Sequence, residues 1–425
     1  MLTIEQQIQH GLRKGLLSQK FKLNASISPS YTQYSLLNLP GSLFRWFQLG
    51  QLHHPPLQID ALDEMADGID QIILVLVDAV AYERAKDWFT MLPAWEALIE
   101  RGLFLPLTSI TPSTTCNVLT TLWTGRSPVE HAILGYELFL KEYGIVANMI
   151  THNPMSYGSG TGGLYQAGFD PETELPVETI GPALKAAGVD VHTYLHYTIA
   201  NSGLSRMHYQ SIQRHAFGSA ADLWIDVRHL AEQPRDKRFI WVYHGAVDNL
   251  SHRFGPDSEQ ARFEFLTYLQ VMFQTLIEPL SRQGKNKTLL LVTADHGQVH
   301  TPQDPRYDLT GHPDLLGMLH IKPTGENRLI YFHPRPEQTQ AVADYIHHAW
   351  PGDFVTLTST EALKLGLFGP GTMARTVPDR IGDLIAFPTG NAYLWWADKP
   401  NPLLGRHGAF DPLEMLVPLL AVRLD

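Results

Sequence analysis

Short apolar runs that end close to an acidic residue recur along the chain. QIILVLV ends directly before Asp78, RFIWVYH lies shortly before Asp248, and TLLLVTA ends directly before Asp295. Runs of this length, rich in β-branched and other apolar residues, are typical of strands that are buried on both faces of a parallel sheet. A segment with helical spacing and a further apolar run, LFLPLTSI, follow the first strand, as in a strand–helix–strand unit. The pattern predicts an α/β fold with a doubly wound, mostly parallel sheet flanked by helices.

Other parts of the chain do not follow this alternation. Residues 140 to about 235 contain the glycine-rich SYGSGTGG, and residues 320 to 400 contain the strand-like RLIYFH among proline and glycine turns. We interpret both as cap insertions that cover the active edge of the sheet and select the substrate. Residues 1–66 are predicted to form an N-terminal helical extension, and residues 67–425 the main domain. The final segment, GRHGAFDPLEMLVPLLAVRL, should return to the core as an apolar helix or strand.

Composition and charge restrict the class of partner. The chain has 425 residues, with 32 basic against 43 acidic residues and a net charge of -11, and it contains no Lys/Arg-rich run. An extended nucleic-acid groove or an anionic membrane surface is therefore not expected. A small anionic substrate remains compatible with this charge if bound metal ions supply the positive field.

Targeting signals and disulfides are not expected either. One cysteine excludes an internal disulfide. The N-terminal segment lacks the apolar run of a signal peptide, and no stretch approaches the ~18 apolar residues of a membrane span. We therefore expect a cytoplasmic protein.

A cluster of hydroxyl residues, TPSTTCNVLTTLWTGR at residues 111–126, opens a predicted helix after the strand-like LFLPLTSI. Serine and threonine are good N-caps, and capping alone is one explanation of the cluster. A second explanation is catalytic, because an alcohol held by a metal ion becomes a nucleophile and a helix N-terminus favours phosphate. In that case one hydroxyl is the nucleophile and the others cap the helix.

Carboxylates and histidines at predicted strand ends supply candidate metal ligands. We expect Asp248 and His252 to lie in a loop after their strand, and His407 is flanked by glycines. Oxygen and nitrogen donors suit Zn²⁺, Mn²⁺ or Mg²⁺, and the absence of thiolates argues against a structural cysteine site. Six such donors and one hydroxyl make seven ligands. Seven are too many for one tetrahedral ion but suit the two-ion sites of phosphoryl-transfer enzymes. The six nitrogen and oxygen candidates are Asp78, Asp248, Asp295, His252, His296 and His407.

Five motifs resemble the type I phosphodiesterase/nucleotide pyrophosphatase family, which belongs to the alkaline phosphatase superfamily. They are ILVLVDAV, TPSTTCNVLTTLWTGRSPVEHAILGY, VDNLSHRFGP, LLVTADHGQV and RHGAFDPLEMLVPLLA, in the family's order and separation. The resemblance implies an alkaline-phosphatase-like fold with Thr115 as the nucleophile, or its neighbour Thr114 if the alignment slips by one. It implies one metal site formed by Asp78, Thr115, Asp295 and His296, and a second formed by Asp248, His252 and His407.

The chain departs from the family pattern at the phosphate-binding position. Nucleotide-cleaving members often carry an asparagine three residues after the nucleophile, where this chain has Val118. Either Asn117 or backbone N–H groups could bind the phosphate oxygen instead, and we take Asn117 as the candidate. Cys116 lacks the proline and arginine of a sulfatase motif, and we interpret it as a buried or half-buried thiol. His131 and His312 are interpreted as structural or substrate-side residues.

The resemblance implies a hydrolase that acts on a small phosphate ester, with no nucleic-acid polymer as its partner. It would be a two-metal phosphodiesterase or nucleotide pyrophosphatase that works through a phosphothreonine. Two divalent cations are implied, with Zn²⁺ preferred and Mn²⁺ as the alternative, and a homodimer is left open. The same ligands would also serve a phosphomonoesterase, a phosphonate hydrolase or a phosphoryl transferase. A catalytically silent, metal-dependent binding protein is a further alternative, which the presence of the complete ligand set disfavours.

Overall fold

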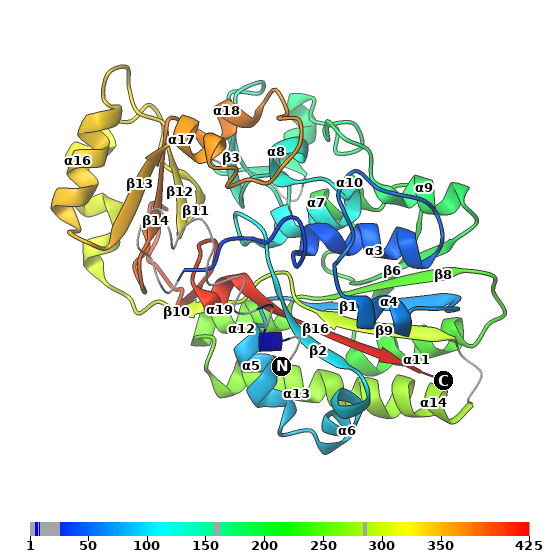
Figure 1. Ribbon diagram of the computed structural model, residues 1–425. Helices are drawn as coiled ribbons and strands as arrows, with labels where there is room; N and C mark the ends of the chain where they lie inside the picture. Colours follow the sequence, from blue (N-terminus) through cyan, green and yellow to red (C-terminus); the bar gives the residue numbers. More distant parts are fainter. Residues whose placement is uncertain (1–4, 7, 9–25, 157–161, 284–286, 425) are drawn as a thin grey trace.

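Two seven-stranded β-sheets organise the computed structural model, which describes residues 5, 6, 8, 26–156, 162–283 and 287–424 (Figure 1). In the main sheet only β16 runs antiparallel to its neighbours, and the other pairs are parallel. The predicted α/β class with a mostly parallel sheet is therefore confirmed. Its strands, in spatial order, are β2 (Leu103–Thr108), β16 (Leu416–Arg423), β9 (Thr288–Thr293), β1 (Gln71–Val77), β8 (Arg238–His244), β6 (Asp190–His196) and β7 (Gln213–Phe217).

The apolar runs become strands because helices cover both faces of the main sheet. Every residue of β1 and β9 is buried. In Figure 1, α5, α6 and α13 lie below this sheet and α3, α7 and α10 lie above it. The helical segment after Asp78 is split into two helices, because Pro93 begins α6 and cannot donate the backbone N–H that a continuous helix requires.

The remaining elements have the following bounds. The helices are α3 (Leu39–Trp46), α4 (Asp60–Met65), α5 (Tyr82–Phe89), α6 (Pro93–Arg101), α7 (Thr115–Thr124), α8 (Pro128–His131), α9 (Ile180–Ala186), α10 (Gly203–His208), α11 (Ala220–Ala231), α12 (Ala246–Phe254), α13 (Glu259–Met272), α14 (Glu278–Gln283), α15 (Pro313–Gly317), α16 (Thr339–Ala349), α17 (Ser359–Lys364), α18 (Val377–Ile381) and α19 (Pro412–Met415). Strands β10 (Val299–His300) and β15 (Gly405–Arg406) form a separate two-stranded sheet.

A second sheet, which we call the cap sheet, is antiparallel throughout. It joins two distant parts of the sequence, because Gly325 of β11 pairs with Glu137 of β3. The two predicted cap insertions therefore share one sheet. Its strands, in spatial order, are β13 (Phe354–Thr358), β14 (Leu384–Pro388), β12 (Leu329–Phe332), β11 (Thr324–Glu326), β3 (Glu137–Leu140), β4 (Ile145–Asn148) and β5 (Asn153–Pro154).

Residues 140 to about 235 do not all belong to the cap sheet, because β6 and β7 form one edge of the main sheet. This part of the predicted insertion is thus a piece of the main sheet. Its strands, DVHTYLH and QRHAF, mix polar with apolar residues and were not recognisable in the sequence as strands of that sheet. The domain division at residue 66 stays a prediction, and most of the helix expected at the N-terminus lies outside the described residues.

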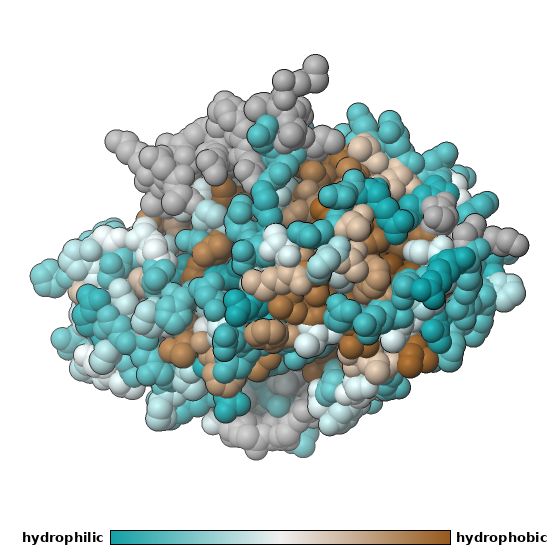
Figure 2. All heavy atoms as spheres, turned by 90° about the horizontal axis from the view of Figure 1, so that it is seen from below, coloured by the Kyte–Doolittle hydropathy of each residue, from teal (hydrophilic) through white to brown (hydrophobic). Residues whose placement is uncertain are grey.

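The cap sheet packs on two hydrophobic clusters, one on each face. The large cluster that surrounds the main sheet includes Tyr331 and Phe387 from one face of the cap sheet. A smaller cluster, with Phe332, Ile346 and Trp350, lies between α16 and the other face. Figure 2 shows hydrophilic and hydrophobic residues mixed over the face seen from below. Within the described ranges, the helices are all too short or too polar to cross a bilayer.

Candidate metal centre and active site

The parallel strands bring two candidate carboxylates to one edge of the main sheet. Asp78 directly follows β1, and its backbone N–H donates to the carbonyl of His244 at the end of β8 (2.9 Å). Asp295 follows β9 by two residues and is fully buried. Its Oδ1 accepts the backbone N–H groups of Ala79 (3.2 Å) and His296 (2.9 Å). Ligand sites in such sheets lie at the carboxyl ends of the strands, as this pair does.

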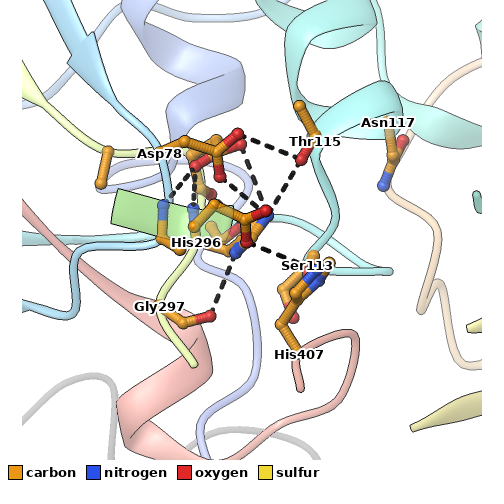
Figure 3. Close-up of polar contacts among 12 residues, drawn as sticks. Asp78, Ser113, Thr115, Asn117, His296, Gly297 and His407 are labelled. Atoms are coloured by element: carbon orange, nitrogen blue, oxygen red, sulfur yellow. Dashed lines mark hydrogen bonds and ion pairs between the residues drawn. The ribbon is translucent and has the colours of Figure 1, made fainter. Parts of the chain in front are cut away.

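Thr115 is the first residue of α7, and its hydroxyl contacts Asp78 and His296 at this edge. Thr115 Oγ1 lies 3.4 Å from Asp78 Oδ2, to which it donates, and 3.3 Å from His296 Nε2 (Figure 3). The N-cap residue Thr114 makes no side-chain capping bond to any described N–H, and the Ser113 hydroxyl donates to the carbonyl of Ala409. The prediction that the neighbouring hydroxyls cap this helix is therefore wrong for these two residues.

Asp248 and His252 lie on a helix, whereas the sequence analysis placed them in a loop. The helix α12 begins two residues after β8, so their four-residue spacing puts both side chains on one helical face. Asp248 stands in the first turn, where the helix dipole favours a carboxylate. His252 Nε2 is 3.3 Å from Asp248 Oδ1, and His407 Nε2 is 4.0 Å from the same oxygen.

All three histidines of the candidate site have the same hydrogen bond at Nδ1, the ring nitrogen that points away from the carboxylates. In each ring Nδ1 donates to a backbone carbonyl, so Nε2 faces the carboxylates, and in the neutral ring that atom presents a lone pair to them. Two acceptors that face each other repel unless a cation lies between them, and backbone carbonyls behind a ring are the usual support of a metal-binding histidine. The pairs are His252 Nδ1 with Gly405 O (2.8 Å), His296 Nδ1 with Gly297 O (3.0 Å) and His407 Nδ1 with Ser113 O (2.9 Å).

The electrostatics of the cluster also fit divalent cations. Burial raises the pKa of Asp78 well above its usual range, and the charges of Asp295 and Asp248 raise it further. Burial, together with His296 and His252, holds the pKa of His407 well below its usual range. Asp78 Oδ1 and Asp295 Oδ2 have no hydrogen-bond partner among the described residues. Cations between these groups would offset the cost of burying the carboxylates.

Ligand atoms of the cluster form two groups that share one residue. Asp248, His252 and His407 form one group, and Asp78, Asp248 and His296 form the other, with the ligand atoms of each group within 4.8 Å of one another. Thr115 and Asp295 contact His296. The structure thus brings together all seven residues that were predicted as metal ligands, with the Asp248 carboxylate between the two groups.

Asn117, by contrast, does not reach the site. It is fully buried, and its amide donates to the carbonyl of Pro112 (2.6 Å). Two residues along a helix correspond to a rotation of about 200°, so Asn117 points away from the face that presents Thr115 (Figure 3). The predicted phosphate contact therefore has no counterpart in this arrangement.

The other residues that the sequence analysis set apart are structural. Cys116 is a buried thiol whose Sγ lies 3.1 Å from the carbonyl of Gly135. His131 contacts the Thr121 hydroxyl through Nε2 and accepts the backbone N–H of Ile133 at Nδ1. His312 contacts the Tyr345 hydroxyl and the carbonyl of Arg306.

Two residues that the sequence analysis did not identify hold the carboxylates. The Tyr243 hydroxyl donates to Asp78 Oδ2, and the Gln298 side chain donates to Asp248 Oδ1. Gln298 closely follows Asp295 and His296 in the ADHGQ motif, which is a signal for it. Tyr243 lies within an apolar strand, where nothing in the sequence distinguishes it from a core residue.

A cavity of about 390 Å³ opens beside this centre, between the edge of the main sheet and the cap sheet. Thr115, Asp248 and His407 line it on one side. Glu137 and Glu326 of the cap sheet line the other side, together with aromatic side chains such as Trp396. Burial raises the pKa of Glu326 to about 8, so its carboxyl adds little negative charge to the cavity at neutral pH.

Comparison with known proteins defines the class. Residues 72–410 match the type I phosphodiesterase / nucleotide pyrophosphatase family, and the chain belongs to this family. No match was found among curated proteins.

Solved structures share its fold at low sequence identity. Murine ectonucleotide pyrophosphatase/phosphodiesterase 5 is 17% identical with a TM-score of 0.60, covering 83% of this chain and 88% of that chain. An inactive variant of that protein in complex with AMP gives the same identity and coverage, with a TM-score of 0.61. Phosphonoacetate hydrolase from Sinorhizobium meliloti 1021, in complex with phosphonoformate, is 19% identical with a TM-score of 0.58, covering 83% of this chain and 90% of that chain.

Proposed function

We propose that the protein hydrolyses small phosphodiesters by nucleophilic attack of Thr115 on phosphorus. The observation that carries the proposal is the position of Thr115 Oγ1, within 3.4 Å of Asp78 Oδ2 and 3.3 Å of His296 Nε2 at the start of α7. The Thr115 hydroxyl gives up its proton to solvent and its oxygen bonds to phosphorus, while the bond to the leaving alcohol breaks and that alcohol takes up a proton. The phosphothreonine keeps the second ester group, and water then cleaves its bond to Thr115 and releases a phosphomonoester. Thr114, the alternative nucleophile, makes no hydrogen bond with Asp78 or His296.

Two divalent cations fit the donor set, and imidazole with carboxylate ligands favours Zn²⁺, with Mn²⁺ as the alternative. Asp78, Thr115, Asp295 and His296 would hold one cation, and Asp248, His252 and His407 the other. When bound, the cations would neutralise phosphate charge and lower the pKa of the attacking alcohol.

The chain's own residues position and polarise the reacting groups. Tyr243 fixes the Asp78 carboxylate, and the N-terminal N–H groups of α7 face the region where phosphate charge would accumulate. The cap sheet closes the cavity from the other side and would exclude bulk water. The cavity volume of about 390 Å³ leaves room for the ester groups of a small diester beside the phosphate.

A phosphonate hydrolase is the second candidate. The same metal ligands would serve it, and phosphonoacetate hydrolase has a similar fold. Selectivity would then come from cap-sheet residues that bind the group attached to phosphorus. A phosphomonoesterase, a phosphoryl transferase and a catalytically silent binding protein stay as further alternatives.

Hydrolysis of bis-p-nitrophenyl phosphate beside p-nitrophenyl phosphate tests the proposal. The protein is stripped of metal and reloaded with Zn²⁺ or Mn²⁺, and Thr115→Ala is compared with the matched variant Thr114→Ala. We expect faster cleavage of the diester, dependence on metal, and a loss of at least about 1,000-fold in kcat for Thr115→Ala. Thr114→Ala should retain most of the activity.

A loss in Thr114→Ala with normal activity in Thr115→Ala would assign the nucleophile to the neighbouring residue. Preference for the monoester would contradict the diesterase assignment. No turnover of either ester by the metal-loaded protein would favour a binding role. A cytoplasmic location and a homodimer stay predictions, which cell fractionation and light scattering of the purified protein would check.

A further inference from the structure

A second, smaller cavity of about 50 Å³ adjoins the candidate nucleophile. It shares Thr115 and Ile150 with the large cavity, so the two meet at this threonine. Its walls are mostly apolar and include Leu119 one turn along α7, Leu204 and, at the end of α10, His208. Since one water needs roughly 10–15 Å³ of such space, the cavity can hold on the order of three or four non-hydrogen atoms.

His208 presents an unused hydrogen-bond acceptor in this region. The Thr120 hydroxyl donates its single hydrogen to the carbonyl of Cys116 (2.6 Å), which is shorter than its 2.9 Å contact with His208 Nε2. It must therefore accept a hydrogen from Nε2, which leaves Nδ1 as a bare lone pair. His208 is 1% exposed, and its Nδ1 has no partner among the described residues.

The neutral form of this ring is the stable one. Burial lowers the pKa of His208 to about 3, and the nearby His131 and His152 act in the same direction. A buried acceptor without a donor costs on the order of 1–3 kcal/mol, so the site favours a ligand that supplies one.

Other polar groups on the cavity wall already have partners. The Ser205 hydroxyl donates to the carbonyl of Ile199, and the Ser202 hydroxyl donates to Ser205 Oγ. The Tyr243 hydroxyl donates to Asp78. A water in the cavity would find few partners besides His208 Nδ1, and a substrate group that carries its own donor would readily displace it.

We propose that this cavity is a specificity subsite for the ester group that stays on phosphorus. It would accept a short apolar group of about three carbons that carries one O–H or N–H donor for His208 Nδ1. The inference rests on the proposed function, because it takes the phosphoryl group to be bound beside Thr115. It names a substrate class: phosphoesters of short hydroxyalkyl groups.

The test is the affinity of the zinc-loaded protein for two phosphonates, 3-hydroxypropylphosphonate and propylphosphonate, measured by isothermal titration calorimetry. Both carry the same phosphonate, and only the first has a donor at the end of the chain. We expect the hydroxylated compound to bind about three- to tenfold more tightly, as one neutral hydrogen bond allows. Equal affinity, or weaker binding of the hydroxylated compound, would overturn the proposal.

His208→Gln removes Nδ1, and its amide nitrogen can still donate to the Thr120 hydroxyl. The amide oxygen then lies one bond farther along the side chain than Nδ1 did, so it does not replace Nδ1 in position. In this variant we expect the affinity ratio to fall to about one. His131→Gln is the matched control, because His131 is also buried and contacts a threonine of α7 through Nε2, but does not line the cavity. The control should keep the wild-type ratio, and a His208→Gln protein with the wild-type ratio would refute the role of Nδ1.

The binding and hydrolysis experiments together distinguish an error in the subsite proposal from an error in the proposed hydrolase activity. Hydrolysis of bis-p-nitrophenyl phosphate without a preference for the hydroxylated phosphonate would contradict the subsite alone. A clear preference in binding without hydrolysis of any diester would contradict the hydrolase alone.

Discussion

At the scale of single residues, Tyr243 and Gln298 orient the carboxylates that would hold the cations. Tyr243 donates to Asp78 Oδ2, while Asp78 Oδ1 stays without a partner among the described residues. Gln298 donates to Asp248 Oδ1, the oxygen closest to the two histidines of that group. Partners of this kind fix the direction of a ligand and tune its basicity, so their loss weakens a metal site without removing a ligand.

Tyr243→Phe should therefore lower the affinity for Zn²⁺ or the kcat/KM for a diester by about 10- to 100-fold. Competition with a fluorescent zinc chelator measures the first quantity, and hydrolysis of bis-p-nitrophenyl phosphate the second. The matched control is Tyr268→Phe, because Tyr268 is equally buried but its hydroxyl has no described partner. Equal behaviour of the two variants would show that the Tyr243 hydroxyl does not support the site.

The residues that could be recognised from the sequence are those whose chemistry conflicts with their surroundings. An aspartate at the end of an apolar run, or a histidine beside it, has no packing role, and this made Asp78 and His296 visible. Tyr243 and His208 look like ordinary core residues, because their function depends on which atom of a buried side chain has a partner. Asn117 has suitable chemistry, but the rotation of the helix turns it away from the cavity.

At the scale of elements, a buried ion pair fastens the cap sheet to the segment that carries His407. Arg328, in the turn between β11 and β12, donates to both carboxylate oxygens of Glu414 on α19, at 2.8 and 2.7 Å. Glu414 Oε1 also accepts the backbone N–H of Ala409, two residues after His407. The exposed fraction of the side chain is 1% for Arg328 and 0% for Glu414, so neither charge can turn to water if the other is lost.

Arg328→Met should lower the free energy of unfolding by about 3–5 kcal/mol, because it leaves the Glu414 carboxylate buried and unpaired. Urea denaturation followed by tryptophan fluorescence measures this change. Arg282→Ala is the control, since its ion pair with Glu278 is exposed and should contribute at most about 0.5 kcal/mol. A loss below 1 kcal/mol in Arg328→Met would mean that the cap sheet is held by its other contacts.

Some helices and strands could be predicted from the sequence and others could not. The central strands β1, β8 and β9 were visible because burial on both faces leaves an unbroken apolar run. The cap sheet was not, because β3 and β11 are almost 190 residues apart and no local pattern shows that Gly325 pairs with Glu137. The segment with Asp248 and His252 was expected as a loop, since its polar residues hide the short helix α12 on which both side chains face the same way.

At the scale of the whole molecule, the candidate centre depends on segments from residue 78 to residue 407 meeting at one edge of the main sheet. The parallel topology brings the first carboxylates together, and the pairing of β10 with β15 returns the chain so that His407 faces Asp248. The order of the motifs made the family recognisable, and the alternation of apolar runs with helical segments predicted the fold class independently of it. The volume and walls of the cavity come from the cap sheet, so the substrate could not be deduced from those motifs.

The most direct test of the central claim is to trap the phosphorylated protein. Metal-loaded protein is mixed with bis-p-nitrophenyl phosphate, quenched in acid within milliseconds, digested and analysed by mass spectrometry. We expect one p-nitrophenylphosphoryl group on Thr115, because only one of the two nitrophenol groups leaves when the adduct forms. The group should be absent from Thr115→Ala and from protein treated with a chelator. Turnover without any modified peptide, or this group on Thr114 or another residue, would contradict the proposal.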